Sequence, residues 1–223
     1  MLENNRVFHI SIKEYKEDYL EFVNPAKLKR ELFFLIKLHH KYLVEFVGFI
    51  SDPFCVVSKL VDGGDLYQAV KHRKLTAFEK TKIAFEIAEG MEYLHSKHVI
   101  HRDLKTLNVL LHEGSPRITD FGYSRSISLV MSKNVGTSNY MSPEIILAED
   151  GGGYYDYKTD VFSYASVLWE LYSGKIPFEK YHYDSVQIQD AILRGEEMPF
   201  EKIKKKVPIL ENLIKKGRDS YPQ

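Results

Sequence analysis

Residues 101–108 read HRDLKTLN, and the tripeptide DFG follows at 120–122. Aspartate, lysine and asparagine side chains therefore crowd into one short part of the chain. Carboxylate and amide oxygens are the ligands that Mg²⁺ prefers, and a carboxylate can also accept a proton. Either motif alone is weak, because such short strings occur by chance in surface loops. Their value depends on what surrounds them.

Apolar periodicity predicts strands before this stretch. Residues 7–13 alternate apolar and polar side chains, which is typical of a half-buried strand, and the runs 43–50 and 54–60 predict two more strands around a turn at 51–53. Between them, Asn24 and Pro25 favour the start of a helix that continues to His40. Leu28, Leu32, Leu35 and Ile36 recur there at helical spacing.

Helices dominate after the glycine pair at 63–64, which we interpret as a boundary between two parts of the chain. Thr76 and Glu79 form a capping box, followed by a helical face of Ile83, Ile87, Met91 and Leu94. Residues 109–120 predict a hairpin that turns around residues 113–116. A second buried helix is indicated by Val161, Tyr164, Leu168 and Leu171.

A set of residues in fixed order resembles the catalytic domain of eukaryotic protein kinases: Lys13, Glu31, Asp103, Asn108, Asp120 and Glu144. The resemblance covers essentially the whole chain. It implies an α+β fold of two lobes. Residues 1–61 would form an incomplete small lobe with the hinge, and residues 62–223 would form the large helical lobe without its last helix.

The resemblance also implies catalytic roles. Asp103 would accept the proton of a substrate hydroxyl, and Lys105 would steady the γ-phosphate of ATP. Asn108 and Asp120 would bind Mg²⁺. Lys13 would hold the α and β phosphates while paired with Glu31. From the residues alone, Lys13 and Glu31 could equally be a solvated strand-end lysine and a surface glutamate.

Further positions match the nucleotide pocket of the family. Ser58 occupies the gatekeeper position. The remaining expected contacts are Ser11 above the adenine, Leu110 below it, the backbone of Lys59 and Val61 at its edge, and Asp65 at the ribose.

Three positions match structural features of the family. His101 and Phe121 resemble stacked residues that join the lobes, with Leu35 and Phe46 above them. Asp160 resembles the helix aspartate that anchors the catalytic loop, although an aspartate in a first helical turn is also favoured by the helix dipole.

The sequence departs from the family at both ends. No glycine precedes Gly48, so the glycine-rich phosphate loop is missing before Lys13, and GRDSYPQ at 217–223 stops before the arginine that would pair with Glu144. We therefore expect this chain to bind MgATP poorly and to transfer phosphate slowly, unless flanking sequence or a partner completes the small lobe. A pseudokinase or regulatory fragment is the alternative reading.

Composition limits the setting. The chain has 223 residues, 44% of them hydrophobic, and 31 basic residues balance 31 acidic ones, which gives no indication of nucleic acid binding. The single cysteine, Cys55, predicts a small core residue and a reducing, cytoplasmic compartment. No run approaches the roughly 18 apolar residues that a membrane span needs. Protein substrates and ATP are the expected partners.

Residues 123–140 predict a mobile activation loop, with Arg102 ready to receive a phosphate on it. A polar loop that is never modified is the alternative. The candidate phosphorylation sites are Ser124, Ser126, Ser128, Ser132 and Thr137.

Specificity for serine and threonine is predicted by Lys105 and by Gly136 with Thr137, and GTSNYMSPE most resembles the tyrosine-kinase-like group, which includes mixed-lineage and Raf-type kinases. Phosphoamino-acid analysis of products from the full-length protein should give phosphoserine and phosphothreonine. Products that contain phosphotyrosine alone would show that this interpretation is wrong.

Overall fold

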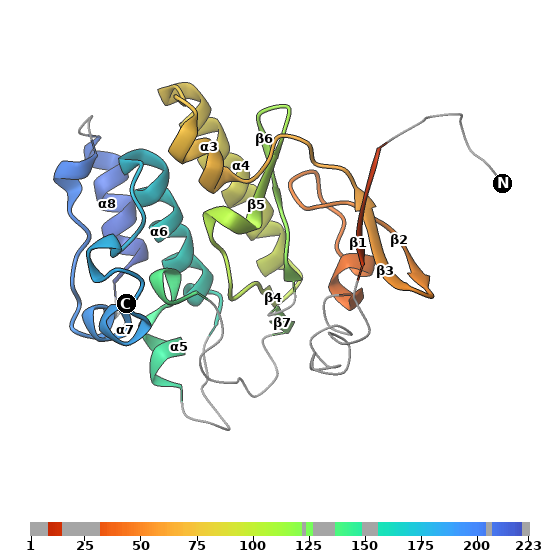
Figure 1. The fold of residues 1–223 in the computed structure, drawn as a ribbon. Helices are drawn as coiled ribbons and strands as arrows, with labels where there is room; N and C mark the ends of the chain where they lie inside the picture. Colours follow the sequence, from red (N-terminus) through yellow and green to blue (C-terminus); the bar gives the residue numbers. More distant parts are fainter. Residues whose placement is uncertain are drawn as a thin grey trace.

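The computed structural model describes residues 9–14, 32–121, 124–126, 137–148, 156–203 and 207–219. A small strand-rich lobe and a larger helical lobe lie side by side (Figure 1). The predicted two-lobed α+β architecture is therefore confirmed. The limits at 61 and 62 remain a prediction.

The small lobe is built on one antiparallel sheet with the strand order β1-β3-β2. Its strands are β1 (Ile10–Glu14), β2 (Phe46–Ser51) and β3 (Phe54–Lys59). The register places Ser11 opposite Ser58 and Lys13 opposite Val56. Cys55, also in β3, is buried as predicted. The sheet thus brings the predicted gatekeeper next to the predicted phosphate-binding strand.

Strand β1 is not half-buried as its alternating pattern predicts. All five of its residues are exposed, with Ile10 at 44% and Ile12 at 53%. The strand lies at the edge of the sheet, and β3 is its only partner among the described strands. Apolar alternation identified the strand correctly but could not show whether a layer covers its outer face.

A helix over residues 32–37 packs against the core through Phe34, Leu35 and Leu38. Ile36, which the sequence pattern placed on the buried face, is 46% exposed. Positions 34, 35 and 38 share one side of a helix of 3.6 residues per turn, whereas position 36 points away. The expected start of this helix at Asn24 lies outside the described residues.

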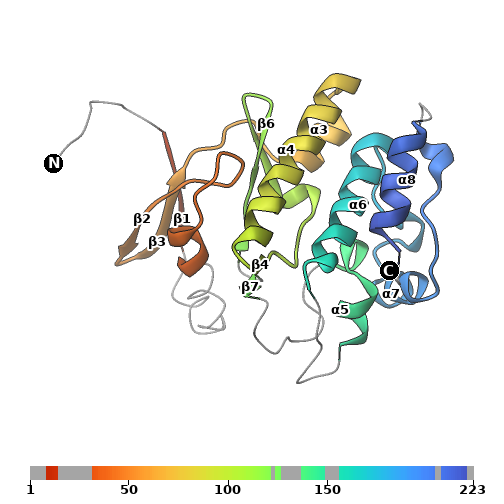
Figure 2. The same ribbon diagram turned by 180° about the vertical axis from the view of Figure 1, so that it is seen from behind.

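The large lobe follows the Gly63–Gly64 turn (Figure 2 shows it from behind). Its α-helices are α3 (Leu66–His72), α4 (Ala77–Ser96), α5 (Pro143–Leu147), α6 (Lys158–Ser173), α7 (Ser185–Leu193) and α8 (Pro208–Gly217). Its short strands are β4 (Val99–Ile100), β5 (Val109–His112), β6 (Ser115–Ile118) and β7 (Arg125–Ser126). Its 3₁₀ turns are η1 (Thr106–Asn108), η3 (Ser138–Tyr140), η4 (Glu179–Tyr181) and η5 (Phe200–Lys202). Among the described helices, none has both the length and the apolar character to cross a membrane.

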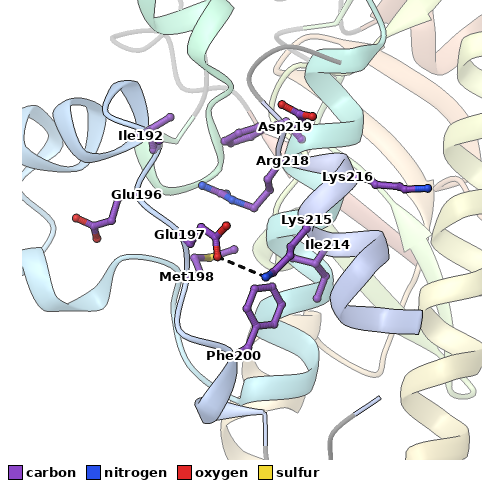
Figure 3. Close-up of a pocket in the computed structure, with 12 residues that line it drawn as sticks. Ile192, Glu196, Glu197, Met198, Phe200, Ile214, Lys215, Lys216, Arg218 and Asp219 are labelled. Carbon is purple, nitrogen blue, oxygen red and sulfur yellow. Dashed lines mark ion pairs between the residues drawn. The ribbon is translucent and has the colours of Figure 1, made fainter. Parts of the chain in front are cut away.

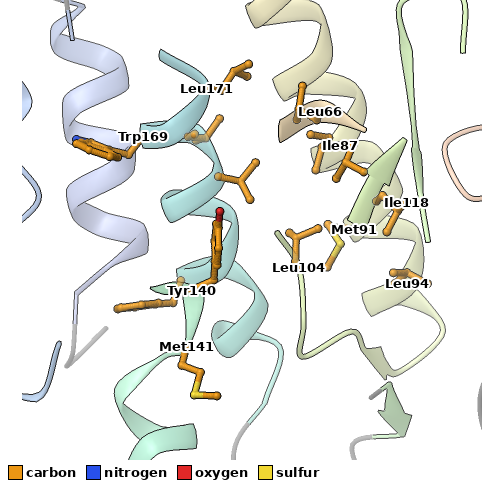
Figure 4. Packing of buried hydrophobic residues seen from close by; sticks show 14 of the residues in the cluster. Leu66, Ile87, Met91, Leu94, Leu104, Ile118, Tyr140, Met141, Trp169 and Leu171 are labelled. Carbon is orange, nitrogen blue, oxygen red and sulfur yellow. The ribbon is translucent and has the colours of Figure 1, made fainter. Parts of the chain in front are cut away.

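Helix α4 confirms the predicted capping box and apolar face. The Thr76 hydroxyl accepts from the Glu79 N–H at 3.2 Å, and the Glu79 carboxylate accepts from the Thr76 N–H at 2.7 Å. Ile83, Ile87, Met91 and Leu94 are all buried, and the last three contribute to the packing in Figure 4. The helix thus forms one wall of the core beneath the catalytic stretch.

Helix α6 lies in the middle of the large lobe, with α4 on one side and α8 on the other. Leu168 and Leu171 are buried as predicted, and Tyr164 is half-buried with its hydroxyl donating to the Ala84 carbonyl at 2.9 Å. Val161 is 41% exposed, against the prediction. Neighbours on two sides bury more of a helix than a single stripe, so Trp169 is buried as well.

The predicted hairpin forms from β5 and β6 and turns at Glu113 and Gly114, whose φ angles are 51° and 74°. Ser115 and Pro116, expected in the turn, already belong to β6. Two positive φ values in a two-residue loop suit the twist of paired strands. The tight hairpin fixes β5, which directly follows the catalytic stretch.

Gly63 is the position of this fold most sensitive to an added methyl group. An alanine Cβ there would lie 2.3 Å from the Leu111 carbonyl oxygen, which also accepts the Gly63 N–H at 2.8 Å. We expect Gly63→Ala to lower the free energy of unfolding by about 3 kcal/mol in urea titrations.

Gly114→Ala is the matched control, because its Cβ meets no atom within 4 Å and only the left-handed φ of 74° is strained. That strain should cost about 1 kcal/mol. Equal losses in both variants would contradict the close approach at Gly63.

Candidate active site

The catalytic stretch is fixed by one buried carboxylate at the start of α6. Asp160 is 1% exposed, and it accepts from the N–H of His101 at 2.9 Å and from the N–H of Arg102 at 2.8 Å. The ring Nε2 of His95 lies 2.9 Å from the same carboxylate. The predicted anchoring role of Asp160 agrees with this geometry, and its place in the first turn of α6 is equally real.

Asp103 lies at the centre of a dense hydrogen-bond network. Its Oδ2 accepts from Lys105 Nζ at 2.9 Å and from Asn108 Nδ2 at 3.0 Å. Asn108 Nδ2 also donates to the Asp103 carbonyl at 2.8 Å. The structure therefore brings together the three residues predicted to be catalytic, with the Asp103 carboxylate held in a single orientation.

Thr137 completes this network, a role that the sequence did not indicate. Its N–H and its hydroxyl donate to Asp103 Oδ1 at 3.0 and 3.1 Å, and its hydroxyl accepts from Lys105 Nζ at 2.7 Å. We had placed Thr137 among the phosphorylation sites of a mobile loop. The residue instead leads into the η3 turn, and its pairing with Gly136 in serine/threonine kinases was the signal that could have shown this.

The other candidate phosphorylation sites are only partly described. Ser124 is fully buried and donates to the His101 carbonyl at 3.4 Å, so it is not available to a kinase in this conformation. Ser126 belongs to β7, which pairs with β4. Arg102, the expected phosphate receptor, is 2% exposed. Ser128 and Ser132 lie outside the described residues.

The two predicted Mg²⁺ ligands, Asn108 and Asp120, suit a hard cation. Nδ2 of Asn108 is used by Asp103, which leaves its carbonyl oxygen for a ligand role. Asp120 follows β6 with a left-handed φ of 65°. The described residues contain no group of three or more His, Cys, Asp or Glu that could hold a metal. A cation here would therefore need additional oxygens, such as those of a nucleotide.

The expected contact between His101 and Phe121 is present, but the rings are not stacked. Their centroids are 5.4 Å apart and their planes are tilted by 58°. His101 Nε2 lies 3.0 Å from the Thr119 carbonyl, and this contact turns the ring. Leu35 belongs to the same hydrophobic core, and Phe46 packs against it.

The predicted phosphate-binding pair is only half described. Ser11 and Lys13 lie on one face of β1, since they alternate with Ile12 in an extended strand. Glu31 lies outside the described residues. The Lys13–Glu31 pair therefore stays a prediction.

The predicted adenine and ribose contacts lie around the hinge. Lys59 Nζ is bound to Glu45 at 3.1 Å, which turns this side chain to a neighbour while its backbone continues into the hinge at Val61. Asp65 caps α3 by accepting from the Gln68 N–H at 2.7 Å, and its backbone bridges to Leu110. Capping already uses one oxygen of Asp65, so its contact with a ribose stays a prediction.

Glu144 has a hydroxyl partner where the sequence suggested that it would have none. The Thr159 hydroxyl donates to its carboxylate at 2.8 Å. Because Thr159 precedes Asp160 in α6, the helix that anchors the catalytic loop also holds this glutamate.

Glu170 is a further buried acid that sequence analysis missed. It is 1% exposed, and its Oε2 accepts from Tyr140 at 2.6 Å and from Thr106 at 2.9 Å. Burial raises the pKa of Glu170 to about 7, opposed by these two donors and by the charge of Lys71. A carboxylate in the apolar run VLWELY needs a partner, and this was the available signal. Glu170 ties the catalytic stretch to the η3 turn.

Comparison with known proteins defines the class. Residues 2–219 match the protein kinase domain, so the chain belongs to the protein kinase domain family. It is 37% identical over 178 residues to serine/threonine-protein kinase STY46 of Arabidopsis thaliana, covering 76% of this chain and 30% of that protein. It is 38% identical over 182 residues to serine/threonine-protein kinase TNNI3K of Mus musculus, covering 76% and 22%.

The particular group within the family follows from the same relatives. The RAF proto-oncogene serine/threonine-protein kinase of Xenopus laevis is 34% identical over 209 residues, covering 87% of this chain and 32% of that protein. The domain is thus of the serine/threonine kinase type, and the predicted likeness to the tyrosine-kinase-like group is confirmed. The chain spans about a third or less of the length of these curated relatives.

The raised pKa of Glu170 predicts how stability depends on pH. Because its folded pKa of about 7 exceeds its ordinary value of 4.5, the protonated form stabilises the fold. This contribution is complete below pH 4.5 and is lost as pH rises through about 7. Glu170→Gln stays neutral, so its free energy of unfolding relative to wild type should rise by about 3 kcal/mol between pH 4.5 and pH 8.

Urea titrations at several pH values measure this difference. Glu92→Gln, a change at an exposed position of α4, should follow the wild-type curve at every pH. A curve for Glu170→Gln that runs parallel to wild type would show that Glu170 ionises without cost.

Proposed function

We propose that this domain transfers the γ-phosphate of ATP, bound with Mg²⁺, to serine and threonine hydroxyls of proteins in the cytoplasm. The family generally uses ATP and Mg²⁺. The observation that carries the proposal is the Asp103 carboxylate, buried and oriented by Lys105, Asn108 and Thr137. Phosphoryl transfer asks mainly for positioning and charge neutralisation, and this network supplies both.

In the proposed reaction, the substrate hydroxyl lies against Asp103 and gives up its proton to the carboxylate. Its oxygen forms a bond to the γ-phosphorus while the bond from that phosphorus to the β–γ bridging oxygen breaks, which releases ADP. Lys105, 2.9 Å from Asp103, is placed to neutralise charge on the phosphoryl oxygens. Bound Mg²⁺ would be held by Asn108 and Asp120 and would offset the charge of the nucleotide phosphates.

The nucleotide would lie between the small sheet and β5. Lys13, paired with Glu31, would contact its α and β phosphates, and the hinge backbone at Lys59 and Val61 would contact adenine. Ser11 and Leu110 would enclose the base from either side, and Asp65 would reach the ribose. The arrangement of these positions around the hinge supports the assignment.

A regulatory, catalytically impaired domain is the second candidate. The chain has no glycine before Gly48, so the described structure offers no glycine-rich loop over the phosphates. Backbone donors of such a loop are worth a factor of about 100 to 1,000 in rate. Nucleotide binding without phosphate transfer in the full-length protein would favour this candidate.

Asp103→Asn separates chemistry from binding. The amide keeps the shape but cannot accept the proton, so kcat for a protein substrate should fall by about 100-fold or more, with the Kd for MgATP changed less than threefold. Radiolabel transfer and calorimetry on the full-length protein measure the two quantities. Asp190→Asn, on the exposed surface of α7, is the control and should leave both unchanged. Undiminished transfer by Asp103→Asn would rule out the proposed base.

A further inference from the structure

Arg218 at the end of α8 is a cation without an acidic partner among the described residues. Its guanidinium lies 4.2 Å from the ring centroid of Phe162 and 5.2 Å from that of Phe178. Nη1 donates to the Ser166 hydroxyl at 2.6 Å. In the described part of the chain, no carboxylate lies within ion-pair distance.

The environment of Arg218 only partly satisfies its charge. Burial lowers the pKa of Arg218 to about 9, so the group remains charged at neutral pH. Two aromatic faces and the carbonyl end of α8 stabilise the cation. A guanidinium has five N–H donors in a planar fork, however, and Ser166 uses only one of its nitrogens. The fork therefore retains the geometry that binds a carboxylate through two parallel hydrogen bonds.

The guanidinium borders a cavity of about 500 Å³ between α6, the end of α7 and α8 (Figure 3). This volume lies in the range of small-molecule sites, about 300–1,000 Å³. Most of its wall is apolar, with Ile192, Met198, Phe200 and Ile214. A ligand with an apolar body and one polar end would fit this lining.

The acids at the cavity are committed elsewhere and disfavour a dianion. Glu196 binds Lys180 at 2.8 Å and Tyr181 at 2.6 Å, and Glu197 pairs with Lys215 at 3.7 Å, the dashed line in Figure 3. Their negative charges would repel a doubly charged phosphate. A single negative charge, directed at Arg218, is the better match.

We propose that this cavity binds a small monocarboxylate with an aromatic or aliphatic body, whose carboxylate pairs with Arg218. The body would lie against Phe200 and Met198. The site is far from the catalytic stretch along the chain, and its occupation does not depend on phosphate transfer.

Two matched probes test charge recognition on the wild-type protein alone. By calorimetry at pH 7.5, 4-phenylbutanoate should bind at least tenfold more tightly than 4-phenylbutanamide, which has the same body without the charge. Acetate, which has the charge without the body, should bind more weakly than either. Equal Kd values for the acid and the amide would overturn the proposal, whatever the variants do.

Variants then place the site. Arg218→Gln should abolish the preference for the acid, and Arg218→Lys should retain part of it because the charge stays but the fork is lost. Lys216→Gln is the control, since the Lys216 side chain points away from Arg218 in Figure 3. A preference that survives Arg218→Gln would show that the acid binds elsewhere.

Phe200→Ala guards against loss of folding at Arg218. Removing this wall should weaken the acid and the amide by the same factor, about fivefold, while the preference for the acid persists. Unchanged binding of both probes would contradict the placement in this cavity. Far-UV circular dichroism of each variant verifies that it is folded.

Discussion

The arrangement of the active site depends on one carboxylate. Asp160, buried at the start of α6, accepts two backbone N–H groups from residues 101 and 102 and lies beside the ring of His95. A buried acid is stable only when such donors compensate it. In return it holds Arg102 in a left-handed conformation, with φ of 68°, and this turn directs Asp103 toward Lys105 and Asn108. Without that turn, the chain would leave β4 in a different direction.

Helix α6 repeats this arrangement along its length, because several of its buried polar side chains each hold a separate segment. Thr159 binds Glu144, Ser163 donates to the Tyr140 carbonyl at 2.8 Å, and Glu170 accepts from Tyr140 and Thr106. A helix with neighbours on both sides cannot satisfy such groups with water, so each needs a protein partner. The large lobe is therefore organised by polar contacts within an apolar core.

Elements and catalytic residues were predictable where a periodic pattern or an ordered motif exists. The face from Ile83 to Leu94, the capping box at Thr76 and the grouping of Asp103 with Lys105 and Asn108 all agree with the structure. The exposure of Ile12, Ile36 and Val161 was not predictable, because a periodic pattern cannot show which neighbours cover a face. Thr137 and Glu170 were missed for a related reason, since their partners lie more than 30 residues away in sequence.

The network around Asp103 also constrains the proposed reaction. Its two oxygens already accept four hydrogen bonds, from Lys105, Asn108 and two groups of Thr137. A carboxylate offers about four lone-pair sites, so a substrate hydroxyl must displace a donor to reach it. The Thr137 hydroxyl has the longest of these bonds, at 3.1 Å, and it can keep its contact with Lys105 at 2.7 Å when it lets go. Thr137 is therefore the donor that gives way at the lowest cost, and the backbone N–H beside it keeps Asp103 oriented while the hydroxyl enters.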